Sequence, residues 1–170
     1  MTDAGLPVGP VRPSAAVSAG AAVATALVVG TTGAPAFALS GLGLASLAVG
    51  LRYRSRPAVT AALCLLWLAI VIAALAGLPP EAVGVALVAA VLAWDAAHRG
   101  LTLGAHLTTR AATARIEGIH ALGTLAVGFA GFGIAYALSW FVGGVGAPAT
   151  VLAFALAVGL LAYAVESSGR

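Results

Sequence analysis

Long runs of apolar residues without a charged side chain dominate this sequence. Charged residues make up only 8% of the 170 residues, and the apolar set from alanine to cysteine makes up 62%. Soluble domains carry about 25% charged residues, which cover their water-exposed surface. A helix needs only about 20 mostly apolar residues to cross a bilayer. The composition therefore excludes a disordered chain and a typical soluble enzyme, and it predicts an integral membrane protein.

Six stretches are apolar and long enough, or nearly so, to cross a bilayer. Every backbone N–H and C=O inside the hydrocarbon has to be paired within its own segment, so such stretches predict helices. We therefore predict a single domain, an all-α bundle of six transmembrane helices. The predicted spans are residues 14–30, 35–51, 58–78, 82–97, 119–145 and 148–165. Proline or glycine lies in the short connections, and only the connection at residues 98–118 is long.

The first apolar stretch also has a feature of a secretory signal. The sequence Ala36-Phe37-Ala38 resembles a signal cleavage site. Against cleavage, the basic leader is weak, because it contains Asp3 and a single arginine, and another apolar run follows at once. The sequence leaves open whether residues 1–38 are removed. In either case the next span enters the membrane from outside, and the remaining topology is the same.

The positions of the basic residues, all of them arginine, predict the orientation in the membrane. With six spans and a cytoplasmic N-terminus, every arginine falls in a cytoplasmic tail or connection. The outer connections then contain no basic residue and one acid, Glu81, as the positive-inside rule requires. We predict that both termini lie on the cytoplasmic side of the plasma membrane. The arginines are Arg12, Arg52, Arg54, Arg56, Arg99, Arg110, Arg115 and Arg170.

The connection at residues 98–118 predicts a surface for lipid or for a partner. Its polar residues recur at steps of three and four, with leucine and alanine on the neighbouring face, which is typical of an amphipathic helix. The pattern fits one helix at the cytoplasmic surface and also fits extensions of the fourth and fifth spans. The stripe either meets lipid phosphates or docks a protein. The candidate contacts are Arg99, His106, Arg110 and Arg115.

Two acid-x-x-His pairs lie at the two ends of this connection, Asp95 with His98 and Glu117 with His120. If the fourth and fifth spans pack together, these four side chains could converge on a transition metal. The alternative is a polar cluster of Asp95, Glu117 and His120, in which Asp95 pairs with Arg99 four residues later and Glu117 pairs with an arginine of the loop. Carboxylates within a membrane are costly unless paired, so both acids are candidate functional residues.

No other pattern predicts catalysis, a cofactor or nucleic-acid binding. Cys64 is the only cysteine, and we expect it to be a buried apolar filler in the middle of its span. Small residues at four-residue spacing, such as Gly41 and Ala45, permit close helix contact. Phosphate-binding glycine loops and the HExxH zinc pattern do not occur. In the connection at residues 98–118 too few basic residues are clustered for nucleic-acid binding, and no aromatic residue lies among them to stack on bases, which excludes nucleic acid as a partner.

A pattern of residues in the second half of the chain allows a further comparison. A predicted span ends in a Trp-Asp pair, and glycine, arginine and acidic residues then lead into a Gly-rich span. The residues of this pattern are Trp94, Asp95, Gly104, Leu107, Arg110, Arg115, Glu117, His120 and Ala121. Over residues 94–165 the chain resembles an uncharacterised family of small multi-pass membrane proteins from halophilic archaea. Members of that family are often encoded beside MoxR-type AAA+ ATPases, so the resemblance implies an accessory role beside such an ATPase. His98 and Arg99 depart from the family pattern, which argues against the four-ligand metal site.

These observations predict a non-enzymatic accessory or scaffold subunit of a membrane assembly. It would dock a partner through residues 98–118, and the sequence leaves its oligomeric state open. The alternative is a small transporter or channel subunit in which Asp95, Glu117 and His120 handle ions or protons. The span centres contain almost no ionisable residue, which favours the first interpretation.

Overall fold

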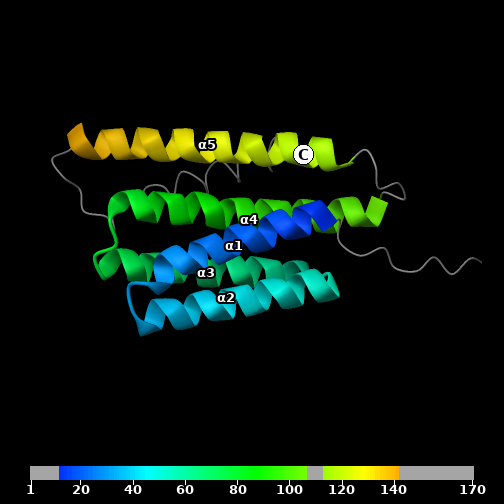
Figure 1. The fold of residues 1–170 in the computed structure, drawn as a ribbon, viewed down its shortest axis with the longest axis horizontal. Helices are drawn as coiled ribbons and strands as arrows, with labels where there is room; N and C mark the ends of the chain where they lie inside the picture. The colour runs from blue at the N-terminus through cyan, green and yellow to red at the C-terminus, as the bar shows by residue number, and fades with distance from the viewer. Residues whose placement is uncertain (1–11, 107–112, 142–170) are drawn as a thin grey trace, which may run out of the picture.

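Five helices form the part of the chain that the computed structural model describes, residues 12–106 and 113–141. They are α1 (Arg12–Gly30), α2 (Ala34–Tyr53), α3 (Arg56–Leu75), α4 (Pro80–His106) and α5 (Thr113–Phe141) (Figure 1). These ranges contain no strand. All five helices are long and apolar enough to cross a membrane, which indicates a membrane protein. The predicted sixth span, residues 148–165, lies outside the described residues.

Proline and glycine determine where the helices begin. Pro35 and Pro57 lie in the first turns of α2 and α3, and α4 begins at Pro80. Proline is tolerated there because the first N–H groups of a helix have no partner within the helix. Gly77, between α3 and α4, has a φ of 94°, which glycine adopts without strain. The resulting turns are short, so α1 to α4 run alternately up and down.

The bundle is built around α4, which packs against α1, α3 and α5. The most extensive contacts are those of α2 with α3 and of α1 with α4, and α5 lies at one side of the bundle beside α4 (Figure 1). Half of the described buried apolar residues are alanine, and the other half are larger residues such as Leu66, Ile70 and Leu87. Small side chains let helix backbones approach closely, which stabilises helix pairs where lipid provides no hydrophobic driving force.

Contacts between α4 and α5 occur along the length of both helices. Two are hydrogen bonds between side chains, and two place a glycine of one helix against a bulky side chain of the other. The pairs are Glu81 with Tyr136, Gly84 with Phe132, Val88 with Gly128, and Asp95 with Thr124. The order of these pairs shows that α4 and α5 are antiparallel.

Helix α4 is longer than the apolar stretch at residues 82–97 that marks the predicted fourth span, since it continues to His106. Asp95 lies inside this helix and forms an ion pair with Arg99, one turn later. Residues 98–106 thus belong to α4 and residues 113–118 to α5, while residues 107–112 lie outside the described part.

The expectation for Cys64 is wrong. The side chain is exposed on α3 because the buried face of that helix is formed by neighbours such as Ala62, Leu66 and Ala69. Helical periodicity places Cys64 on the opposite face from Ala62 and Leu66, so it points away from the bundle.

Candidate functional site

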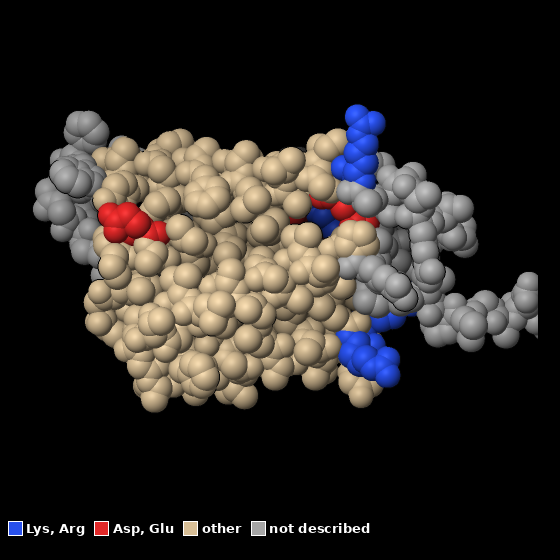
Figure 2. All heavy atoms as spheres, in the orientation of Figure 1, with Lys and Arg blue, Asp and Glu red and all other residues tan. Residues whose placement is uncertain are grey.

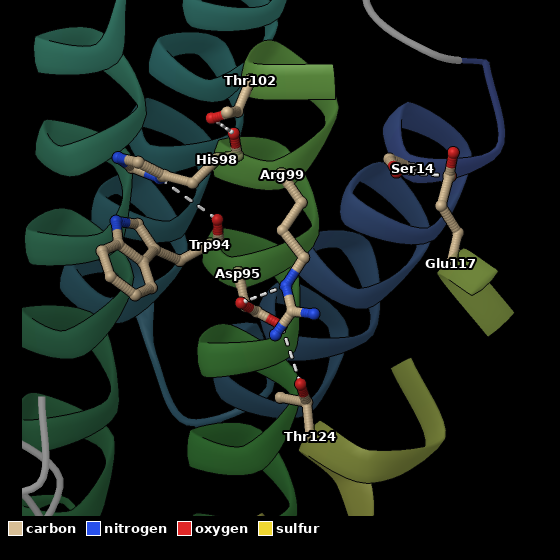
Figure 3. A network of polar contacts seen from close by, with 8 residues as sticks. All are labelled: Ser14, Trp94, Asp95, His98, Arg99, Thr102, Glu117 and Thr124. Atoms are coloured by element: carbon tan, nitrogen blue, oxygen red, sulfur yellow. Dashed lines mark hydrogen bonds and ion pairs between the residues drawn. The ribbon is translucent and has the colours of Figure 1, made fainter. Parts of the chain in front are cut away.

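Asp95 lies between two hydrogen-bond donors on two helices. Its Oδ1 accepts a hydrogen bond of 2.8 Å from Nε of Arg99 on α4, and its Oδ2 accepts one of 2.7 Å from the hydroxyl of Thr124 on α5 (Figure 3). The predicted pairing of Asp95 with Arg99 is therefore confirmed. The side chain of Asp95 is 22% exposed and that of Arg99 is 37% exposed. Both carboxylate oxygens have a partner, which offsets the cost of placing this charge among apolar helices.

Glu117, in the second turn of α5, binds a different helix. Its Oε2 accepts a hydrogen bond of 2.5 Å from the hydroxyl of Ser14 on α1 (Figure 3). Its other oxygen, Oε1, is buried and has no hydrogen-bond partner in the described part of the chain. Ser14 is itself buried. Among the described residues Glu117 binds a serine, and Arg110, an arginine of the loop that could form the expected pairing, lies outside them, so that pairing stays a prediction.

The side chains of Asp95, Arg99, Glu117 and Ser14 line one pocket of about 120 Å³ between α1, α4 and α5. Figure 2 shows a hollow between α5 and α1 with acidic and basic atoms at its base. The apolar part of the wall comes from residues such as Val17, Leu92 and Ala121. The polar part comes from Ser14, Asp95, Arg99, Glu117 and His120. The polar cluster expected from Asp95, Glu117 and His120 therefore lines a single pocket.

His98 points away from this pocket. Its Nδ1 lies 3.2 Å from the backbone oxygen of Trp94, and the two rings pack with centroids 4.5 Å apart. Figure 3 shows both rings extending to the left of α4, away from Arg99 and Thr124, the partners of Asp95. Within residues 12–106 and 113–141, no three His, Cys, Asp or Glu side chains are close enough to share a metal ion. The four-ligand set of Asp95, His98, Glu117 and His120 is therefore not brought together.

The four residues proposed to meet lipid or a partner have different surroundings. Arg99 is engaged by Asp95, whereas Arg115 is exposed near the start of α5. His106 is the last residue of α4, and its side chain is not among those described. Arg110 lies outside the described residues.

Two residues that complete the cluster, Ser14 and Thr124, were missed by sequence reasoning. Neither is charged, and each lies far along the chain from the acid that it binds. Ser14 belongs to a series of hydroxyl residues on the buried side of α1. Ser18 donates to the backbone oxygen of Ala93 at 2.7 Å, and Thr25 lies within 3.3 Å of that of Ala86. The sequence signal for the buried face of α1 is the recurrence of a hydroxyl residue every one to two turns of an apolar helix.

The bundle has different charges at its two ends. Arg52, Arg54 and Arg56 lie where α2 ends and α3 begins. The last turns of α4 and the start of α5, with Arg115, are at the same end of the bundle (Figures 1 and 2). We call this end, with these four arginines, the arginine end. Among the described residues the opposite end has no arginine; it has Glu81, whose carboxylate accepts a hydrogen bond of 2.6 Å from Tyr136. The pocket lies close to the arginine end.

Comparison with known proteins gives one match. The model of a family described as a family of unknown function, DUF7519, matches residues 8–163. No curated protein and no solved structure matches the chain.

Proposed function

The chain belongs to the DUF7519 family of unknown function, and we propose that it is a non-enzymatic accessory or scaffold subunit of a membrane assembly. In this proposal the protein crosses the plasma membrane six times, with residues 148–165 as the sixth span and both termini in the cytoplasm. It docks a partner at the arginine end, through residues 98–118.

The charge asymmetry of the bundle supports this orientation. The described arginines on the helices and turns of the bundle gather at one end, and Glu81 lies at the other. Cytoplasmic segments of membrane proteins carry an excess of arginine and lysine. The arginine end is thus the cytoplasmic end in the proposal. Exposed Arg52 and Arg115 would lie at the depth of the lipid headgroups or beyond it.

The length of α4 is the observation that carries the docking proposal. At the arginine end α4 reaches farther than α1, α2 or α3 (Figure 1). The helix continues past the pocket to His106, and α5 begins on the other side of the connection at Thr113. A helix that projects beyond its own bundle offers a partner a rigid surface without rearrangement of the core.

The resemblance of residues 94–165 to small haloarchaeal membrane proteins suggests the kind of partner. Members of that family are often encoded beside AAA+ ATPases of the MoxR type, so a cytoplasmic ATPase of this class is the partner we propose to test first. In the proposed orientation, an ATPase domain that approaches the membrane from the cytoplasm would face the arginine end of the described bundle.

Co-purification tests this docking. The full chain with an affinity tag is extracted in a mild detergent after cross-linking in cells, and bound proteins are identified. We expect Arg115→Glu to reduce recovery of the partner by tenfold or more. The matched control is Arg52→Glu, which changes an exposed arginine at the same end but in the last turn of α2. Recovery of the tagged protein alone, or equal recovery with both variants, would contradict docking through residues 98–118.

A second candidate function is ion or proton handling, and the pocket is the observation that favours it. Asp95, Glu117 and His120 line the same pocket, and ionisable groups within membrane helices commonly mark ion pathways. Flux of protons and of sodium is measured in proteoliposomes that contain the purified full chain. This function predicts flux that Asp95→Asn abolishes and Glu81→Gln leaves intact. Absence of flux in the unmodified protein would exclude it.

A further inference from the structure

One carboxylate oxygen of the pocket has no hydrogen-bond donor within the described part of the chain. Oε2 of Glu117 accepts from Ser14, but Oε1 is buried and has no partner among the described residues. A buried polar atom without a partner is rare in folded proteins and calls for a specific explanation. The charges of the pocket point the same way, because Arg99 offsets only one of the two carboxylates that line it. A positively charged donor would satisfy Oε1 of Glu117 and offset the second carboxylate of the pocket.

The lining of the pocket limits what that donor can be. A metal ion needs several oxygen or nitrogen ligands, and among the described residues no three acidic, histidine or cysteine side chains are placed to share one ion. Much of the wall is apolar, with Val17, Leu92 and Ala121. An organic ammonium group suits this surrounding better, because its N–H groups can donate to Glu117 while its carbon atoms contact the apolar wall.

Arg99 offers a ligand in the pocket a second contact. It uses Nε for Asp95, and within the described residues its two terminal nitrogens have no acceptor. The guanidinium group is a preferred partner of phosphate because its planar donors match two phosphate oxygens. Glu117 and Arg99 line the same pocket. A ligand that satisfies both therefore carries an ammonium and a phosphate a short distance apart.

We propose that the pocket between α1, α4 and α5 binds the headgroup of an aminophospholipid, with the ammonium on Glu117 and the phosphate on Arg99. The position of the pocket fits a lipid better than a soluble ligand. Helices α1 and α5 both pack on α4 but contact each other little, so a groove lies between them (Figure 2). The pocket is near the arginine end, and each end of a bundle that spans a bilayer meets the lipid headgroups of one leaflet. The inference rests on the membrane location and not on partner docking.

Binding of short-chain lipids to the detergent-solubilised full chain tests the proposal by calorimetry. Phosphatidylethanolamine has an ammonium that can donate, phosphatidylcholine has three methyl groups in place of those N–H bonds, and phosphatidylglycerol has no cation. A hydrogen bond to a charged group contributes about 1.5–3 kcal/mol, which corresponds to roughly tenfold to hundredfold in affinity. We expect phosphatidylethanolamine to bind at least tenfold more tightly than the other two lipids.

Two variants locate the site. Glu117→Gln should abolish the preference for phosphatidylethanolamine, whereas Glu81→Gln, at the opposite end of the bundle, should keep it. If Glu117→Gln does not fold, the proposal is tested by the affinities of the unmodified protein for the three lipids. Equal affinity for the three lipids would overturn the proposal, and so would tight binding by a folded Glu117→Gln variant. Free phosphoethanolamine that binds as tightly as the lipid would assign the site to a soluble ligand. Partner recovery is measured separately, so failure of either proposal leaves the other standing.

Discussion

Among single residues, Thr124 tests how strongly α5 is attached to α4. Its hydroxyl gives Oδ2 of Asp95 a donor from the neighbouring helix. We expect Thr124→Val to lower the free energy of unfolding by about 1–2 kcal/mol, because the shape is kept while a carboxylate loses one hydrogen bond. Unfolding of the purified protein in mixed micelles with increasing SDS, followed by circular dichroism, measures this change.

Thr60→Val is the matched control for this prediction. Thr60 is exposed on α3, so the same change of hydroxyl to methyl removes no contact to another helix. It should leave the free energy of unfolding within about 0.5 kcal/mol. An equal loss in both variants would mean that the bond between Asp95 and Thr124 does not stabilise the bundle.

The candidate site was predictable only where contacts stay within one helix. Asp95 and Arg99 are four residues apart, and this spacing alone brings their side chains together. Partners from other helices depend on how helices are rotated and aligned, which no local pattern determines. Thr124 and Ser14 were missed for this reason. The spacing of Asp95 and His98 places them on adjoining parts of α4. Their side chains nevertheless point in different directions, because His98 packs on Trp94 whereas Asp95 binds Thr124 of α5.

Among the helices, the pair of α2 and α3 depends on close approach at Gly50. A Cβ built on Gly50 would lie 2.7 Å from a methyl group of Val59 and 3.0 Å from its backbone nitrogen. The backbone oxygen of Gly50 also accepts the N–H of Ser55 at 2.9 Å. We expect Gly50→Ala to destabilise the protein by about 1–3 kcal/mol, because the backbone of α3 has to move. SDS unfolding measures the effect.

Gly41→Ala provides the control on the same helix. A Cβ at Gly41 would meet nothing within 4 Å, so alanine adds no clash. Alanine also has the higher helix propensity, and the variant should be neutral or more stable by about 0.5–1 kcal/mol. A Gly50→Ala variant as stable as Gly41→Ala would show that α2 and α3 are packed less closely than described.

Helix positions were more predictable than helix faces. Proline and glycine indicated the starts of α2, α3 and α4, because the breaking effect of these residues is local. The face that packs was harder to identify. The pattern of small residues included Gly41 and Ala45, which are exposed, whereas Gly43 and Gly50 are the buried glycines of α2. Alanine and glycine occur on every side of these helices, so hydrophobic periodicity is weak and tertiary packing decides the rotation.

For the whole molecule, the long apolar runs predicted an all-helical membrane protein, and the five described helices confirm that much. The length of α4 was less predictable. Asp95 and Arg99 suggested the end of a span at residue 97, but their mutual pairing allows the helix to continue. The orientation stays a prediction, since it follows from the contrast between the arginine end and the end with Glu81 and needs a measurement in cells.

Cysteine labelling in cells makes that measurement. Cys64 is the only cysteine, so Cys64→Ala gives a background without thiols. In this background Thr31→Cys places a thiol on the exposed turn between α1 and α2, and Tyr53→Cys places one at the arginine end, where Tyr53 is 75% exposed. A maleimide that cannot cross membranes should label Thr31→Cys in intact cells and Tyr53→Cys only after permeabilisation, because arginine-rich ends stay in the cytoplasm. The reverse pattern would contradict the proposed orientation, and labelling of both from one side would show that α2 does not cross the membrane.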